Sequence, residues 1–184
     1  QLLSTAVNSS GVLPVPLGYA QKSISLQPLE ALPHSTLATA RRINGDLDEA
    51  LAAYDHALSL DSTLLEAIAG KAEVLESLGR TDEARNILRS TRTNGSVLIA
   101  LAKSRAARNA QQPEEALEAI DSVMNQPLSA YHKSNMLMHQ GRVLEELGRY
   151  DEAWHAWEDG NKLHAGNFDL DSHVKLVDQI IDTT

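Results

Sequence analysis

The stretch Gly79-Arg-Thr-Asp-Glu-Ala84 decides the fold, because its pattern of a helix breaker, an acidic pair and an alanine occurs four times in the 184-residue chain. The other copies are Gly45-Asp-Leu-Asp-Glu-Ala50, Gln111-Gln-Pro-Glu-Glu-Ala116 and Gly148-Arg-Tyr-Asp-Glu-Ala153. Their alanines lie 34, 32 and 37 residues apart. A period of this length is typical of proteins that stack one small structural unit on the next.

Each position of the pattern has a physical reason. A glycine just past a helix can adopt the left-handed conformation that ends it. An acidic pair in the first turn of the next helix lies at the positive end of that helix dipole. Pro113 suits a first helical turn, where its missing N–H costs no hydrogen bond. The small alanine lets two helices approach closely. The pattern therefore predicts helix, tight turn, helix.

Composition supports a helical chain and narrows its partners. Leu and Ala dominate, and there are only two Trp, four Tyr and one Phe. A net charge of -9 and a pI near 5.2 argue against a nucleic-acid surface. No apolar stretch approaches the roughly 18 residues that a membrane span needs. The absence of cysteine excludes disulfides but does not identify the cellular compartment. We expect the protein in the cytoplasm more than in the periplasm or another compartment.

The repeated pattern resembles the tetratricopeptide repeat (TPR), a helical hairpin of 34 residues. The second and fourth copies match well; the fourth has Leu137, Gly141 and Leu144 before the turn and Ala153 and Trp157 after it. The resemblance covers residues 20–163 and implies an all-α, right-handed superhelix (α-solenoid) of about four hairpins. We expect these hairpins at residues 31–64, 65–96, 97–130 and 131–164. The third departs most from the family pattern.

The two ends of the chain lie outside this pattern. Residues 1–19 carry no charge and contain two prolines, which predicts a degenerate hairpin or a disordered segment. Residues 165–184 are expected to supply a C-terminal capping helix, since an open stack exposes its last apolar face. Within it Val174, Val177, Ile180 and Ile181 fall on one helical face.

A narrower resemblance concerns the C-terminal part. The stretches Gly148-Arg-Tyr-Asp-Glu-Ala-Trp154, Gly160-Asn-Lys-Leu163 and Phe168-Asp-Leu-Asp-Ser-His173 are similar to the junction in bacterial TPR-containing sulfotransferases. In that family a sulfotransferase domain follows the repeats. The resemblance implies an accessory region of a larger enzyme, whose catalytic domain would lie C-terminal to residue 184. It assigns no catalytic residue to this chain.

The chain shows no pattern that indicates catalysis. No glycine-rich phosphate loop occurs, and no histidines lie in a zinc-binding arrangement. His132 and His139 are seven residues apart, but two groove or surface histidines explain that spacing more simply than a metal pair does. We therefore expect no enzyme activity, no cofactor and no metal in these residues.

The aromatic residues fall into two groups. Tyr54, Tyr150 and Trp157 occupy positions where the repeat family keeps core residues between hairpins, so burial is expected in preference to ligand stacking. Trp154 falls outside that pattern. It is expected to be exposed and to be a contact for a neighbouring domain.

The family lines its binding groove with the first helix of each hairpin, on the concave side. The resemblance, taken position by position, implies a groove formed by Thr39, Arg42, Glu66, Ala69, Glu73, Arg105, Arg108, Met138, Arg142 and Glu145. The alternative is that these residues form an ordinary solvated helix face. Arginines among glutamates predict a partner segment of mixed charge, because a guanidinium can bind a carboxylate through two hydrogen bonds.

Three hypotheses for function follow. The first is a protein–protein interaction scaffold that binds a peptide or a helical segment in the groove. The second is the accessory region of a sulfotransferase, with a C-terminal domain of the same polypeptide as its partner. The third is self-assembly into a homo-oligomer through exposed hairpin ends. None of them requires nucleic acid or a membrane.

Overall fold

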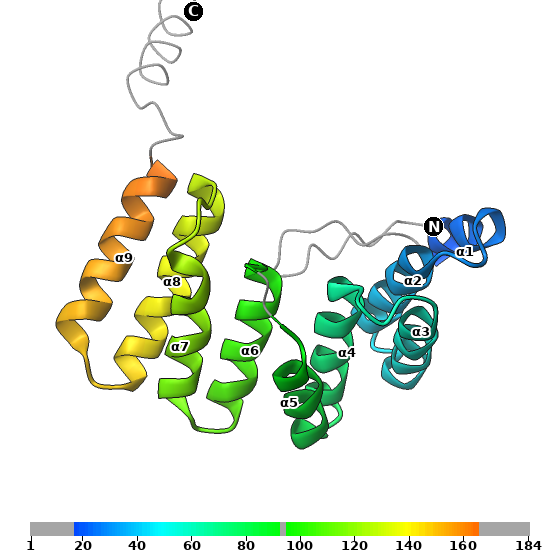
Figure 1. The fold of residues 1–184 in the computed structure, drawn as a ribbon, viewed down its shortest axis with the longest axis horizontal. Coiled ribbons are helices and arrows are strands. Elements are labelled where there is room, and N and C mark those ends of the chain that lie inside the picture. Colours follow the sequence, from blue (N-terminus) through cyan, green and yellow to red (C-terminus); the bar gives the residue numbers. More distant parts are fainter. Residues whose placement is uncertain (1–16, 93–94, 166–184) are drawn as a thin grey trace, which may run out of the picture. The chain divides into compact units, whose positions relative to one another are not determined.

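The computed structural model describes residues 17–92 and 95–165, and every regular element in those ranges is an α-helix (Figure 1). This confirms the expected all-α fold class. No helix in the described ranges is both long and apolar enough to cross a lipid bilayer. The helices are α1 (Leu17–Leu26), α2 (Ala31–Asn44), α3 (Leu47–Leu60), α4 (Leu65–Ser77), α5 (Thr81–Ser90), α6 (Val97–Asn109), α7 (Pro113–Met124), α8 (Ala130–Glu146) and α9 (Tyr150–Ala165).

The chain divides into two compact units, residues 1–92 and 93–184. In the first unit each helix from α1 to α5 packs on the next one, and α2 also contacts α4. In the second unit α6 to α9 pack in the same sequential way, and α6 also contacts α8. The hairpins are α2/α3, α4/α5, α6/α7 and α8/α9. We call the first helix of each hairpin its A helix and the second its B helix.

All four turns inside the hairpins close in the same way. At the first turn the Gly45 N–H donates to the Arg42 carbonyl at 3.1 Å, and the Asp46 N–H donates to the Arg41 carbonyl at 3.0 Å. Corresponding bonds close the turns at residues 79, 111 and 148. This pattern requires a left-handed residue after the helix, and φ is 89° at Gly45. Gln111 adopts the same conformation with φ 57° although it carries a side chain.

The alanine of each repeated pattern is buried, with at most 1% of its surface exposed, at Ala50, Ala84, Ala116 and Ala153. In every copy the acidic pair stands in the first turn of the B helix. The pattern therefore acts as predicted: its polar positions start a helix, and its alanine allows the A and B helices to approach closely.

The core of the first unit is built around Tyr54 of α3, which is fully buried among small residues. Its ring lies against Gly70 of α4, where an added Cβ would overlap the phenol oxygen. In the second unit Trp157 of α9 lies against Gly141 of α8 in a similar way. The prediction that Tyr54 is a core residue is confirmed, and Trp157 is partly buried.

The expected burial of Tyr150 is wrong, because 69% of its surface is exposed. Tyr150 is the first residue of α9, at the position that Leu47 holds in α3. Leu47 packs against a cluster that includes residues of α4, the helix after α3. Within residues 95–165 no helix follows α9, so Tyr150 has no equivalent surface to cover it.

Two expectations concern the ends of the chain. Helix α1 begins at Leu17, so the boundary expected after residue 19 falls inside a helix. The expected capping helix lies outside the described residues.

Candidate binding faces

The A helices of the first unit are joined by an ion pair. Arg42 Nη1 of α2 lies 3.2 Å from Glu73 Oε2 of α4, and both side chains are about one-third exposed. Beside them Thr39 Oγ1 lies 2.9 Å from the phenol oxygen of Tyr54. Burial raises the pKa of Tyr54, although its hydrogen bond to Thr39 and the nearby Arg42 charge act in the opposite direction. The phenol therefore stays neutral and can hold Thr39 in place.

The other two groove residues predicted in this unit, Glu66 and Ala69, differ in how much of their surface is exposed to solvent. Glu66 is exposed at the start of α4. Ala69 is only 4% exposed and offers a partner almost no surface. The A-helix surface of the first unit thus presents an internally paired arginine and glutamate, with further acidic groups beside them.

In the second unit an ion pair joins α6 to α8. Arg108 Nε donates to both carboxylate oxygens of Glu146, at 2.9 and 3.1 Å, and Arg108 Nη2 also contacts Oε1. Hydrogen bonding to Glu146 raises the pKa of Arg108. This pair places the two A helices in register, so that Arg105, one turn earlier on α6, lies close to the level of Arg142 on α8.

His139 lies within a group of arginines. Burial lowers the pKa of its imidazole, and the charges of Arg142, Arg108 and Arg105 lower it further. Three guanidinium groups from two adjacent helices therefore act on one neutral ring. Arg142 is exposed and forms no ion pair with another residue in the range 95–165. A carboxylate from outside the chain would be attracted to this group of cations.

A hollow of about 360 Å³ is lined by the N-terminal half of α8 and by α9, and its residue Met138 lies one turn before Arg142 on α8. Tyr131 and Met138 give it apolar lining, and Ser134, Asn135 and Asn161 complete it. The Ser134 hydroxyl donates to the Gly160 carbonyl at 2.7 Å and so ties α8 to α9 beneath the hollow. We call the surface formed by Arg105, Arg108, Tyr131, Asn135, Met138, His139 and Arg142 the α6/α8 face.

Of the five groove residues predicted in this unit, Arg105, Arg108 and Arg142 all act on His139. Met138 lines the hollow between α8 and α9. Glu145 is exposed farther along α8. Tyr131 and Asn135 are absent from the groove predicted from sequence, and His139 enters that prediction only as a poor metal candidate. A signal for the first two was present, because residues 131, 135, 138, 142 and 145 recur at the spacing of one helical stripe.

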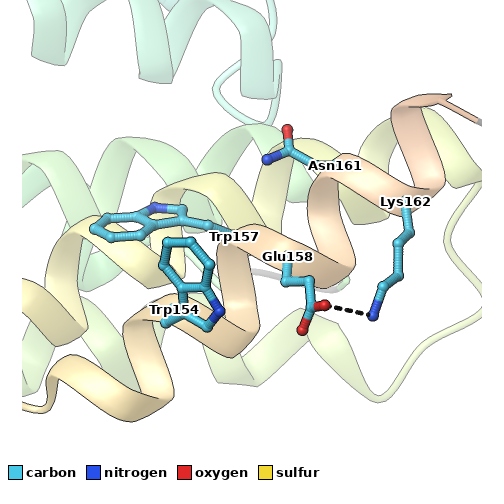
Figure 2. Close-up of a pocket in the computed structure, with 5 residues that line it drawn as sticks. All are labelled: Trp154, Trp157, Glu158, Asn161 and Lys162. Carbon is cyan, nitrogen blue, oxygen red and sulfur yellow. Dashed lines mark ion pairs between the residues drawn. The ribbon is translucent and has the colours of Figure 1, made fainter.

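A second hollow, of about 350 Å³, is lined by α9 alone (Figure 2). The indoles of Trp154 and Trp157 lie next to each other at one end, and the Glu158–Lys162 ion pair, at 3.2 Å, flanks them. Trp154 is 66% exposed, as its position in the sequence predicts. No group of three or more residues able to hold a metal ion occurs in the described ranges.

Comparison with protein families gives two matches, both described as tetratricopeptide repeat, at residues 42–94 and 101–160. A search of curated proteins gives no match. These matches carry no indication of a sulfotransferase, so the narrower resemblance at the C-terminal part has no support from them.

Several solved structures share the fold. TTC0263, a thermophilic TPR protein of Thermus thermophilus, has a TM-score of 0.71 and 15% identity, covering 90% of this chain and 89% of that one. MamA from Desulfovibrio magneticus RS-1 has a TM-score of 0.64 and 17% identity, covering 83% and 86%. YrrB, described as a TPR protein with an unusual peptide-binding site, has a TM-score of 0.58 and 24% identity, covering 80% and 76%.

Proposed function

Because the chain belongs to the tetratricopeptide-repeat family, we propose that it is a protein-interaction scaffold and that its α6/α8 face binds an acidic segment of a partner protein. The observation that carries the proposal is the group of three arginines around His139. The peptide-binding site named for YrrB is consistent with this use of the fold. The role is one of binding and not of catalysis.

The face defines the partner's chemistry more closely. The hollow beside Tyr131 and Met138 suits one apolar side chain of the partner. Met138 and Arg142 are one turn apart, about 6 Å along the helix axis. An apolar anchor followed within about two extended residues by Asp or Glu therefore fits both parts of the face. This narrows the mixed-charge segment expected from sequence to one that is acidic where it meets the second unit.

A labelled peptide with a Leu anchor followed by a run of Glu provides the test, in a fluorescence polarisation titration. R105E/R142E should weaken binding about ten-fold, because the exposed Arg142 loses an ion pair of roughly 0.5–1 kcal/mol and the two new carboxylates repel those of the peptide. The same peptide with Lys in place of Glu should bind poorly to the parent chain.

The matched control compares two single changes on α8. R142E alters the α6/α8 face, whereas K133E makes the same charge change on the opposite side of the helix, since nine residues correspond to about half a turn beyond two full turns. K133E should retain the parent affinity. Equal affinities of the parent, R142E and the double variant for the peptide would show that the α6/α8 face does not bind it.

The family matches give no support to the sulfotransferase alternative. Its motivating stretch extends beyond residue 165, outside the described residues, and no observation on the described part of α9 favours it. The exposure of Trp154 does not favour a sulfotransferase domain over any other partner that could pack against it.

A further inference from the structure

The turn between α6 and α7 differs from the turns of the other three hairpins. Gln111 takes the left-handed conformation there, with φ 57°, whereas the other turns have Gly45, Gly79 and Gly148 at that position. A residue with a Cβ is strained in this conformation and glycine is not, and strain of this kind is found most often at functional sites. The third hairpin therefore carries a side chain at a position where the backbone favours none.

The side chain of Gln111 lines a hollow of about 450 Å³, which we call the turn hollow. Its other lining residues are Arg108 and Asn109 at the end of α6, Pro113 at the start of α7 and Glu146 at the end of α8. Gln111 and Asn109 are exposed, and neither amide side chain forms a hydrogen bond with another residue in the range 95–165. Their donors and acceptors can therefore bind a group from outside the chain.

The groups around the turn hollow favour an uncharged polar ligand. Arg108 and Glu146 form an ion pair with each other, so their charges largely cancel. A carboxylate entering the hollow would be repelled by Glu146, and an ammonium group would be repelled by Arg108. Each of the two amides offers N–H donors and a carbonyl acceptor. A carboxamide, the side-chain group of Asn and Gln, has matching donors and a matching acceptor and can bond to both.

The turn hollow continues the α6/α8 face, because Arg108 belongs to both. Along α8 the apolar Met138, the exposed Arg142 and Glu146 of the turn hollow follow one another at intervals of four residues. Four residues of helix rise about 6 Å, a length that about two residues of an extended chain also span. A peptide extended along α8 therefore brings every second side chain to the next of these three places.

We propose that the turn hollow binds an Asn or Gln side chain of the partner segment, and that Gln111 and Asn109 are the residues that select it. The inference rests on the proposed function and adds a third position to the recognised sequence. That sequence is an apolar residue, then Asp or Glu, then Asn or Gln, each separated from the next by about one residue. The side chain of Gln111 thus has a role in recognition that glycine at the same turn could not have.

Two labelled peptides, Leu-Glu-Glu-Glu-Gln-Ser and Leu-Glu-Glu-Glu-Ala-Ser, test the inference by fluorescence polarisation with the full chain. The parent should bind the Gln peptide about five-fold more tightly than the Ala peptide, as one or two hydrogen bonds between neutral groups predict. Q111G should bind both peptides equally, with the parent's affinity for the Ala peptide. This variant has the residue that the other three hairpins have at their turns, so the turn itself is preserved.

Two further variants complete the experiment. N109A removes the second amide and should also reduce the preference for the Gln peptide, whereas N125A removes an exposed amide at the opposite end of α7 and should keep that preference. Equal affinity of the parent for the two peptides would overturn the inference and leave the proposed function standing. A Q111G chain that still prefers the Gln peptide, or that loses affinity for both peptides to the same extent, would also overturn it. Failure of the parent to bind either peptide would overturn both proposals.

Discussion

Single glycines set how closely the helices of each unit approach one another. Gly70 and Gly141 both lie inside A helices, where glycine weakens a helix by roughly 0.5–1 kcal/mol relative to alanine. Each is nevertheless in contact with a large aromatic ring that leaves no room for a Cβ. Glycine at these two positions weakens the helix but leaves room for the rings of Tyr54 and Trp157.

We expect Gly70→Ala to destabilise the protein, although alanine is the better helix former. The new Cβ would overlap the Tyr54 phenol oxygen, and overpacking of a full core costs about 1–3 kcal/mol. Urea denaturation gives the comparison. Gly18→Ala, where nothing lies within 4 Å, is the control and should be neutral or stabilising. Equal stability of the two variants would show that Tyr54 does not rest on Gly70.

His139 should make binding of the acidic peptide dependent on pH. In the free protein burial and three arginines lower its pKa from 6.5. A bound carboxylate favours the imidazolium, so the pKa rises on binding and the complex takes up a proton. Affinity should therefore increase as the pH falls through the pKa that His139 has in the complex. Polarisation titrations at several pH values measure how the affinity depends on pH. H139N should abolish this pH dependence and H132N should retain it. An unchanged pH dependence in H139N would show that His139 is not the titrating group.

The fate of the two tyrosines shows what a single sequence can predict for residues. The place of Tyr54 in the repeat predicts burial, and its neighbours on α2 and α4 bury it. Tyr150 satisfies the same family pattern but is exposed. Burial of a repeat position depends on the next helix in the stack, and that information is not in the residue itself.

At the scale of elements, the hairpin turns were predictable because their chemistry is local. The glycine and the acidic pair act within one or two turns of helix, so the repeated pattern indicates helix ends directly. The composition of the α6/α8 face was only partly predictable. Its cations were identified from family positions, but the grouping of three arginines around His139 depends on how α6 packs on α8.

The turn after α6 offers a test of that local chemistry. Gln111 is left-handed, with φ 57°, where the other three turns have glycine. A left-handed conformation costs a residue with a Cβ about 1 kcal/mol or more. Gln111→Gly should therefore stabilise the protein by about 0.5–1 kcal/mol in urea denaturation. Gly148→Gln, the reverse change in the next hairpin, should destabilise it by a similar amount. Loss of stability in Gln111→Gly would contradict the assigned turn.

At the scale of the whole molecule, the charge on the α6/α8 face is opposite to that of the chain, which carries -9 overall. An acidic partner must therefore be attracted locally by the arginines. Such attraction is screened by salt, since the Debye length falls from about 10 Å at 0.1 M to about 3 Å at 1 M.

Affinity for the acidic peptide should accordingly fall steeply as salt is added. Polarisation titrations across a salt series measure the slope. R105E/R142E should show a much flatter dependence than the parent, while K133E should follow the parent. A parent affinity that is insensitive to salt would indicate that the hollow beside Met138, and not the arginine group, accounts for binding.

The most direct test of the central claim is a map of the bound peptide on the isotopically labelled protein by NMR. The proposed function predicts that adding the Leu-Glu peptide shifts amide signals on α6 and α8, with the largest changes near Arg105, Met138, His139 and Arg142. Shifts confined to α7 and the outer side of α9, or no shifts at peptide concentrations that saturate the polarisation signal, would contradict it.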